Sequence, residues 1–389
     1  MTVVHSLVSS GLEAPPEWRL SGWEQDCRLH QLAPYIGKLK PVIARELLQS
    51  FTKPGDLVLD CFSGSGTVPL EATLLGRRVL AFDSNPYAIT LTRAKLEAPM
   101  SLEIATMALE QRISDSLRRP EYSPSSIPEW VRKFFHPSTL QNALRFADEC
   151  LERDDQFLLA CLLGILHHQR PGFLSYPSSH LVPYLRDRKF PRAEHPQMYE
   201  ERLLAPRLLA KVQRALKGMS IPRKRSQFHV AKAEVGSLVI RETVDAIITS
   251  PPYMNALDYV RDNRLRMWFL DRTTENYSPE PTDKKEQFDA LTLAFSTNAL
   301  SRLRSGGRCI LVVGETVLRR RTTSHPAERI VAQLLAIDAR LMVEQVINDE
   351  IPDIRRSRRS GAATKRELIV VLRKRSKSQK ICVAVVGPR

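Results

Sequence analysis

The sequence has few of the features that mark secreted, metal-binding or membrane proteins. Its longest apolar run covers ten residues, 157–166, whereas a bilayer-spanning helix needs about 20. The N-terminus lacks the basic region and apolar stretch of a signal peptide, so we expect a cytoplasmic protein without a membrane anchor. No Cys-x-x-Cys pair occurs, which argues against a zinc site and a disulfide framework. The six cysteines are Cys27, Cys61, Cys150, Cys161, Cys309 and Cys382.

Acidic residues are the scarcer of the two charged classes. The chain of 389 residues carries 58 Lys and Arg against 43 Asp and Glu, a formal net charge of +15. Such a balance favours a polyanionic partner, although charge alone fits a merely basic protein equally well. Hydrophobic residues make up 43% of the chain, enough to form a core.

A glycine loop near the N-terminus lacks the hallmarks of the common nucleotide loops. The run at 57–67 is Leu-Val-Leu-Asp-Cys-Phe-Ser-Gly-Ser-Gly-Thr, without the third glycine of Gly-x-Gly-x-x-Gly and without Gly-Lys-Ser/Thr. Gly64 and Gly66 let the backbone turn tightly and approach a ligand. Asp60 would repel a pyrophosphate but attract a cationic amine, and Asp83, ending the next strand, occupies the place of a ribose acceptor. The loop therefore favours S-adenosylmethionine over a dinucleotide.

A second motif follows a buried strand at 246–248. Ser250, Pro251, Pro252 and Tyr253 come directly after it, and two prolines end strand pairing because proline has no N–H. Ligands of open α/β sheets bind at the carboxyl ends of strands. A rigid tip with carbonyls, a hydroxyl and an aromatic ring suits a planar ring that carries an exocyclic amine. An ordinary strand-ending turn is the alternative reading of the motif alone.

Together the two motifs resemble the amino-methylating DNA methyltransferases. Asp60–Gly66 is similar to that family's cofactor loop, and Thr249–Tyr253 is similar to its catalytic motif in the Ser-Pro-Pro-Tyr form, typical of the cytosine-N4 branch. The segment His30–Pro41 resembles the family segment that covers the methionine end of the cofactor. Glu234 stands where the family usually has an aspartate near the adenine.

The resemblance implies a role for each matching residue. It implies that the catalytic residues are Ser250, Pro251, Pro252 and Tyr253. It implies that S-adenosylmethionine is bound by Tyr35, Lys38, Asp60, Phe62, Gly64, Gly66, Thr67, Asp83 and Glu234.

The order of the predicted elements is that of an α/β fold, a Rossmann-like seven-stranded class I methyltransferase sheet with a mainly helical insertion. We expect the cofactor-binding half at 1–97, the insertion and candidate target-recognition region at 98–227, and the catalytic half at 228–389. Apolar spacing predicts strands over 57–60, 78–83, 228–230, 246–248, 308–313, 341–348 and 367–373. It predicts helices over 40–52, 68–75, 86–96, 102–117, 137–152, 156–168, 198–216, 287–303 (ended by Ser305-Gly-Gly307) and 326–337.

The expected function is therefore site-specific methylation of the cytosine N4 amine in DNA, with no covalent intermediate, since the chain has no Pro-Cys pair. Double-stranded DNA is the expected partner, and a partner restriction endonuclease of a restriction–modification system stays open. Arginine clusters at 319–321 and 355–359 suit phosphate contact, and Tyr259 with 261–266 suits the flipped nucleotide.

Four other readings remain. They are adenine-N6 methylation, an RNA or protein amine methyltransferase, a non-catalytic DNA-binding protein that keeps the cofactor site, and a nicotinamide dehydrogenase.

Overall fold

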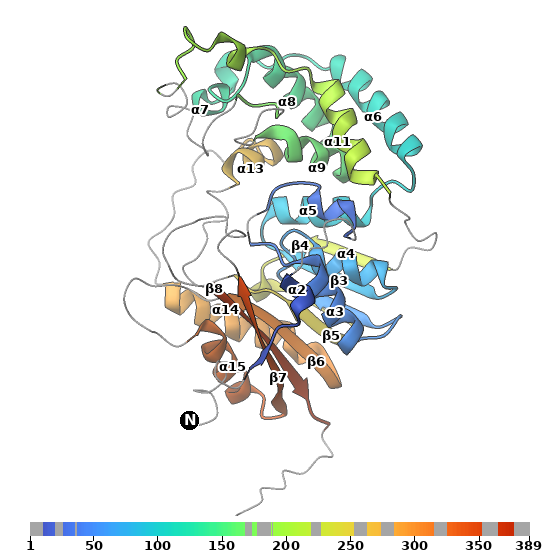
Figure 1. Ribbon diagram of the computed structural model, residues 1–389, viewed down its shortest axis with the longest axis vertical. Helices are drawn as coiled ribbons and strands as arrows, with labels where there is room; N and C mark the ends of the chain where they lie inside the picture. The colour runs from blue at the N-terminus through green and yellow to red at the C-terminus, as the bar shows by residue number, and fades with distance from the viewer. Residues whose placement is uncertain are drawn as a thin grey trace, which may run out of the picture.

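The computed structural model describes residues 11–19, 26–35, 37–167, 173–176, 188, 190–218, 227–252, 263–273, 284–314, 325–351 and 365–376. Its described strands form one sheet of eight in the order β1-β7-β8-β6-β5-β2-β3-β4 (Figure 1). Strands β2 to β7 run parallel to one another, and β8 is antiparallel to both β6 and β7. The strands are β1 Leu12–Glu13, β2 Leu57–Asp60, β3 Arg78–Asp83, β4 Phe228–Lys232, β5 Val244–Thr249, β6 Leu303–Gly314, β7 Leu341–Ile351 and β8 Lys365–Lys374.

The predicted Rossmann-like sheet is confirmed, and each of its seven strands is present. The additional strand β1 is two residues long and pairs with β7 at one edge. The antiparallel pairing of β7 with β8 closes that side of the sheet. Strands buried on both faces explain the near-continuous apolar runs of the sequence.

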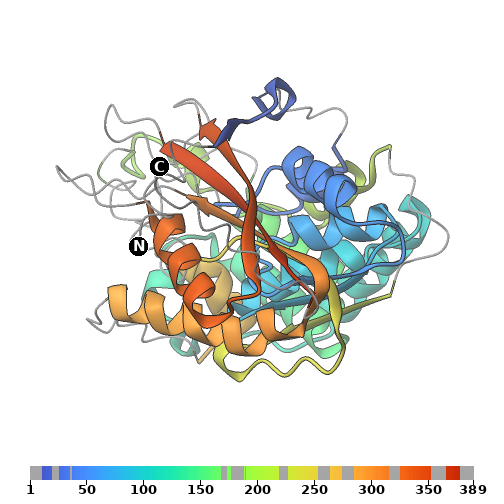
Figure 2. The same cartoon turned by 90° about the horizontal axis from the view of Figure 1, so that it is seen from below.

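Helices cover both faces of the sheet. On one face α3 and α4 pack over Val58, Val79 and Ile248. On the other face α14 and α15 pack over Leu59, Ile247 and neighbouring residues of the same strands. Figure 2 shows the strands between orange α14 and α15 and the blue N-terminal helices. These helices are α2 Pro16–Arg19, α3 Pro41–Phe51, α4 Thr67–Leu74, α5 Pro86–Leu96, α14 Lys284–Asn298 and α15 Pro326–Ile337, with short helices η1 Arg28–Gln31, η4 Val235–Ser237 and η5 Leu300–Arg302.

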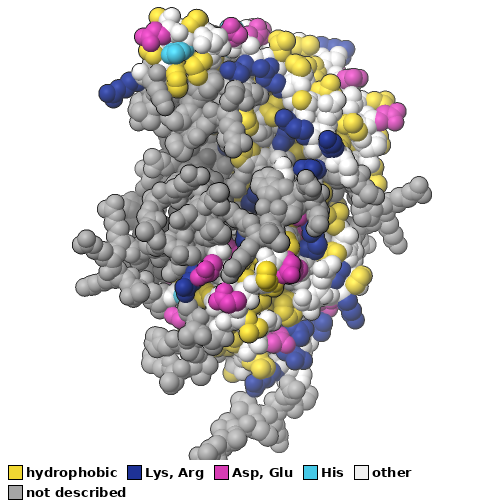
Figure 3. All heavy atoms as spheres, viewed as in Figure 1, with side chains coloured by type: hydrophobic (Ala, Val, Ile, Leu, Met, Phe, Trp, Pro, Cys, Tyr) yellow, Lys and Arg dark blue, Asp and Glu magenta, His cyan; other side chains and the backbone are white. Residues whose placement is uncertain are grey.

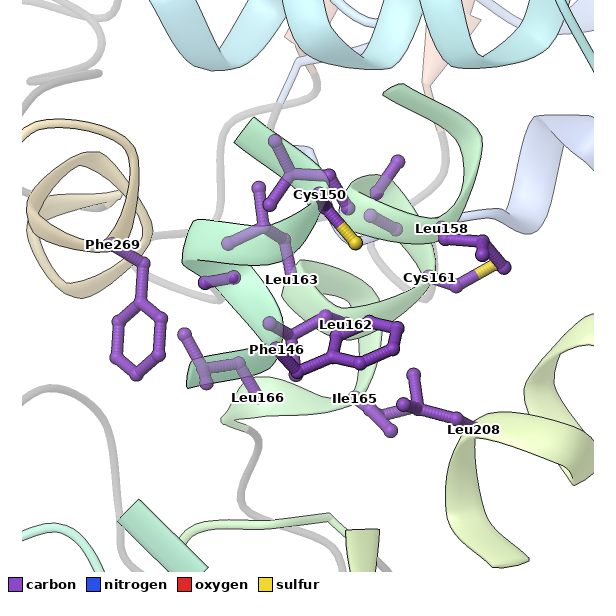
Figure 4. Close-up of a cluster of buried hydrophobic side chains, with 14 of the residues drawn as sticks. Phe146, Cys150, Leu158, Cys161, Leu162, Leu163, Ile165, Leu166, Leu208 and Phe269 are labelled. Atoms are coloured by element: carbon purple, nitrogen blue, oxygen red, sulfur yellow. The ribbon is translucent and has the colours of Figure 1, made fainter. Parts of the chain in front are cut away.

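The elements described between 98 and 227 are helices, as the spacing predicts. Together with α13 they form one helical body, which packs on α5 of the sheet domain. Figure 4 shows its core around α9, with Phe146 of α8, Leu208 of α11 and Phe269 of α13 converging on Leu162 and Leu166. The body contains α6 Leu102–Leu117, η2 Pro124–Ser126, α7 Glu129–Arg132, α8 Pro137–Glu152, α9 Gln156–Leu166, η3 Pro196–Tyr199, α11 Leu204–Leu216 and α13 Arg264–Leu270.

Two predicted helix boundaries are wrong. The helix expected over 198–216 begins at Leu204, and the separate short helix η3 ends before it at Tyr199. The helix expected over 287–303 ends at Asn298, and Ser305-Gly-Gly307 belongs to β6 instead of a helix C-cap. The pairing of β5 with β6 shifts register at this point. A Cβ on Gly307 would lie 2.8 Å from the carbonyl oxygen of Asp245 in β5. The glycine therefore permits a close approach of two strands at a bulge.

Candidate functional site

The two sequence motifs meet at the place where the direction of strand order changes. The sheet continues from β2 through β3 and β4 on one side, and through β5 and β6 on the other. Asp60 is the last residue of β2, and Ser250 directly follows β5. In open α/β sheets this switch point at the carboxyl edge is the usual place of a ligand site.

The glycine loop between β2 and α4 has a backbone that other residues could not adopt without strain. Gly64 has φ +50° and Gly66 has φ +74°, both in the left-handed region. A Cβ on Gly66 would lie 2.8 Å from the Cα of Thr92 in α5, so the loop packs tightly against that helix. A Cβ on Gly64 would lie 3.4 Å from the ring of Tyr35, which places that ring over the loop.

Asp83 holds the loop from the end of β3. Its Oδ2 accepts a hydrogen bond from the Gly64 amide at 2.8 Å, and its Oδ1 accepts one from the Asn85 amide at 2.9 Å. Burial raises the pKa of this carboxyl above its ordinary value, and the backbone donors act in the opposite direction. Each oxygen retains a second lone pair, so the carboxylate can also accept hydroxyl donors from a ligand.

Asp60 is joined to the neighbouring strand β5 by a hydroxyl. The Thr249 Oγ1 donates to Asp60 Oδ1 at 2.6 Å, and the Phe62 amide lies 3.3 Å from Asp60 Oδ1 and 3.2 Å from Thr249 Oγ1. Burial is the largest influence on this carboxyl and raises its pKa to about 7, against the lowering effect of these two donors. Asp83 raises it further by charge repulsion. A cationic ligand group would favour the ionised form.

The tip of β5 is braced against β6 on its other side. The Ser250 hydroxyl donates to the main-chain carbonyl of Val312 at 3.0 Å. Because the hydroxyl proton is used in this bond, the oxygen lone pairs are left to accept donors from a ligand. Pro251 is buried and Pro252 is exposed, while Tyr253 lies outside the described residues.

Phe62 and Pro251 line one small apolar pocket, so the glycine loop and the tip of β5 share a boundary. The ring of Phe62 packs against Phe295 of α14, with 6.3 Å between the ring centroids. The other lining residues come from β6, α14 and α15, namely Phe288, Leu291, Thr292, Phe295, Leu311 and Ile330.

The remaining predicted cofactor residues differ in their relation to the loop. Thr67 begins α4 and its hydroxyl pairs with that of Ser65 at 3.1 Å, so it stabilises the loop from within. Lys38 donates to the His30 carbonyl at 3.0 Å and ties the covering segment to η1. Glu234 is exposed and follows β4, two residues beyond the pair formed by Asp83 and Lys232.

Sequence reasoning missed two residues that hold the loop. Thr249 was recognised only as part of a motif, yet its side chain bonds to Asp60. Lys95 of α5 is 4% exposed, and its ammonium donates to the Ser65 carbonyl. Burial lowers the pKa of Lys95 to about 7, and the nearby Lys38 lowers it further. The only sequence signal for Lys95 is a charged residue on the apolar face of a helix.

The basic residues that follow the Ser-Pro-Pro-Tyr motif differ in their contacts. Arg266 is 6% exposed and donates to the carbonyls of Leu163 and His167 at the end of α9, so it anchors α13 and cannot contact a nucleotide. Arg264 is exposed and lies 4.2 Å above the ring of Trp130. Tyr259, residues 261–262 and the clusters at 319–321 and 355–359 lie outside the described residues.

The arrangement fits the cofactor that the sequence predicts. The loop glycines permit close approach, and Asp83 offers acceptors suited to vicinal hydroxyls. Both bonds to Asp60 end on Oδ1, and no described residue bonds to Oδ2, which leaves that oxygen for a cationic donor.

The described ranges contain neither a metal-binding cluster nor a membrane-spanning helix. Their His, Cys, Asp and Glu side chains form no cluster of three that could hold a metal ion. None of their helices has the length and apolar character needed to cross a bilayer.

Comparison with known proteins identifies part of the chain. Residues 18–94 match the family model described as DNA methylase, the N6_N4_Mtase family. The type II methyltransferase M.MjaII of Methanocaldococcus jannaschii is 30% identical over 78 residues, which are 20% of this chain and 15% of that protein. The chain therefore matches only a small part of that relative's length. The segment 18–94 that matches the family model contains the covering segment, the glycine loop and Asp83.

The solved structures that match this chain have low TM-scores and share little sequence with it. TrmN from Thermus thermophilus is 17% identical with a TM-score of 0.35, over 89% of this chain and 52% of that one. A methyltransferase from Pyrococcus furiosus is 10% identical with a TM-score of 0.32, over 87% of each chain.

Proposed function

We propose that this chain, whose residues 18–94 match the N6/N4 DNA methylase family, transfers a methyl group from S-adenosylmethionine to the N4 amine of cytosine in DNA. The observation that carries the proposal is the Ser250 hydroxyl, which donates to the Val312 carbonyl and so presents its lone pairs at the tip of β5. That tip adjoins the loop held by Asp60 and Asp83.

The methyl donor supplies an electrophilic methyl group on a positively charged sulfur. In the proposed complex Asp60 accepts a hydrogen bond from the donor's amine, Asp83 accepts from its ribose hydroxyls, and Gly64 and Gly66 allow its close approach. Tyr35 covers the loop. Phe62, Thr67 and Lys38 shape and support this pocket, and Glu234 bonds to the adenine.

Ser250 acts on the substrate amine as a hydrogen-bond acceptor. An exocyclic amine is a poor nucleophile because its lone pair is delocalised into the ring. The Ser250 hydroxyl and the main-chain carbonyls of Ser250 and Pro251 accept the amine hydrogens, which favours a pyramidal nitrogen with a free lone pair. Pro251 and Pro252 keep these carbonyls in a fixed direction because their φ angles are restricted. Catalysis is therefore positional and electrostatic.

The target base must leave the duplex to reach this tip. In the proposal Tyr253 stacks on the flipped base, a contact typically worth about 1–3 kcal/mol. Methyl transfer leaves a positive charge on the amine nitrogen. The nitrogen then loses one proton to solvent.

The helical insertion at 98–227 is the proposed target-recognition region. It carries 20 Lys and Arg against 14 Asp and Glu. Dark blue Lys and Arg side chains lie along the upper part of the face drawn in Figure 3, where the helical body is located. Arg264 of α13 presents an exposed guanidinium beside Trp130 on the same body. Basic side chains of this kind bind phosphates and position a duplex.

The deciding experiment expresses the chain in a host that lacks DNA methylation and analyses digested DNA by mass spectrometry. N4-methylcytosine in DNA is the expected product. N6-methyladenine instead would overturn the choice of base and leave the amine chemistry intact. Methylated RNA with unmodified DNA would overturn the substrate class, and bound cofactor with no methylated nucleic acid would indicate a binding protein. The Ser250→Ala variant is the matched control for background methylation.

A further inference from the structure

The buried side chain of Thr249 joins the two halves of the site. The proposed function gives this side chain no role. Thr249 is 0% exposed and lies at the end of β5, while Asp60 lies at the end of the neighbouring strand β2. The Thr249 hydroxyl donates to Asp60 Oδ1 at 2.6 Å and lies 3.2 Å from the Phe62 amide, whose hydrogen it can accept. The three groups thus form a bridge across the switch point of the sheet.

We propose that Thr249 is a positioning residue, whose hydroxyl fixes the Asp60 carboxylate and the Phe62 amide so that the cofactor loop and the catalytic tip keep one geometry. The inference rests on the proposed function for the identity of the ligand. The next residue, Ser250, is bonded to β6 through the Val312 carbonyl, so the tip of β5 is held on both sides. Without the Thr249 hydroxyl, the β2 side would keep only the main-chain pairing that ends at Ile247.

The bridge also governs the charge of Asp60. Burial raises the pKa of Asp60 to about 7, while the Thr249 hydroxyl and the Phe62 amide lower it. The other titratable groups that interact with it are Asp83 from β3, which raises the pKa of Asp60, and the thiol of Cys61, whose own pKa burial raises so that it stays protonated. A hydroxyl donor stabilises a carboxylate more than a carboxylic acid. Removing it therefore shifts ionisation of Asp60 to higher pH.

The test compares Thr249→Val, which keeps the shape and removes the hydroxyl, with Thr249→Ser, which keeps the hydroxyl. Calorimetry measures the affinity for S-adenosylmethionine between pH 5 and pH 8.5. Wild-type affinity should rise with pH to a plateau above about 7, because the cationic amine needs ionised Asp60. In Thr249→Val the rise should shift up by about one pH unit or more, the equivalent of one hydrogen bond to a charged group. At pH 7 the variant should therefore still lie well below the affinity that the wild type has reached. Thr249→Ser should restore the wild-type midpoint.

A second measurement needs no cofactor. The loss of unfolding free energy in Thr249→Val should be larger at pH 8.5 than at pH 5, because the bond is stronger to the ionised acid. Thr139→Val is the matched control, since Thr139 is also 0% exposed and its hydroxyl bonds only to main-chain atoms of Arg202. Its cost should be the same at both pH values.

Equal pH midpoints and equal costs at both pH values in Thr249→Val would refute the role of Thr249. If Thr249→Val fails to fold, Asp60→Asn provides the test. A pH profile of cofactor affinity that is unchanged in Asp60→Asn would show that Asp60 does not cause the pH dependence, and this would refute the role of Thr249. A wild-type protein that binds no S-adenosylmethionine would refute the proposed function instead, and the unfolding measurement would still test Thr249.

Discussion

Replacing Asp83 by alanine should separate two roles of one carboxylate. In the structure Asp83 accepts hydrogen bonds from the Gly64 and Asn85 amides at 2.8 and 2.9 Å. We expect its remaining lone pairs to accept from the ribose hydroxyls of the cofactor. Asp83→Ala should therefore weaken cofactor binding in two ways, by loosening the glycine loop and by removing the ribose acceptor.

The second effect can be measured by itself with a ligand that lacks ribose hydroxyls. One hydrogen bond to a charged group is worth about 1.5–3 kcal/mol, which corresponds to about a 10- to 150-fold change in affinity. The wild type should bind S-adenosylhomocysteine more tightly than its 2′,3′-dideoxyribose analogue by this factor. Asp83→Ala should bind both ligands weakly and with nearly equal affinity, since loosening of the loop affects them alike.

Isothermal titration calorimetry at neutral pH provides the four dissociation constants, and Glu110→Ala, an exposed acid on α6, serves as the control variant. Two results would contradict the reasoning. If Asp83→Ala binds S-adenosylhomocysteine as well as the wild type does, the carboxylate takes no part in the site. If the variant binds weakly but still prefers the ligand with hydroxyls, Asp83 only supports the loop and another group accepts from the ribose.

Three further outcomes are expected. Ser250→Ala should lower kcat by about 10²- to 10³-fold and change cofactor affinity less than about threefold, because its contacts develop in the transition state; a matching loss of cofactor affinity would assign Ser250 to binding. Gly66→Ala should lower the free energy of unfolding by more than Gly55→Ala, as measured by urea denaturation. Both have positive φ, but only the Cβ on Gly66 meets a neighbour, at 2.8 Å, so equal losses would contradict the packing argument. Exchanging 98–227 together with α13 for the same parts of a relative should change the methylated sequence, read by sequencing of modified DNA, and retention of the original site would place recognition elsewhere.

The sheet and most of the site could be predicted because their signals are local. A buried apolar run that ends in an acid is visible at Asp60 and again at Asp83, and parallel strands bring such ends to one edge. The preference of glycine for tight turns is equally local. The positive φ angles of Gly64 and Gly66 confirm the predicted turn.

The parts that could not be predicted depend on contacts between distant residues. The bond between Thr249 and Asp60 joins residues 189 positions apart, and nothing in either motif specifies the rotamer that makes it. Ser305-Gly-Gly307 has the composition of a helix C-cap, but the close approach of Asp245 in β5 decides its conformation. The burial of Arg266 likewise depends on the carbonyls at the end of α9. Local sequence patterns do not contain the distant contacts that decide these conformations.

The position of the helical insertion between β3 and β4 has a consequence for biosynthesis. Strand β3 ends at Asp83 and its partner β4 begins at Phe228, so 144 residues are made between them. At a synthesis rate of about 5–20 residues per second, β3 waits about 7–30 s for its neighbour β4, and β2 waits longer for its neighbour β5. During this interval both strands have an unpaired edge, and unpaired edges are sites of aggregation. The nascent chain is therefore exposed to misassembly on the ribosome at the very segment that carries the glycine loop.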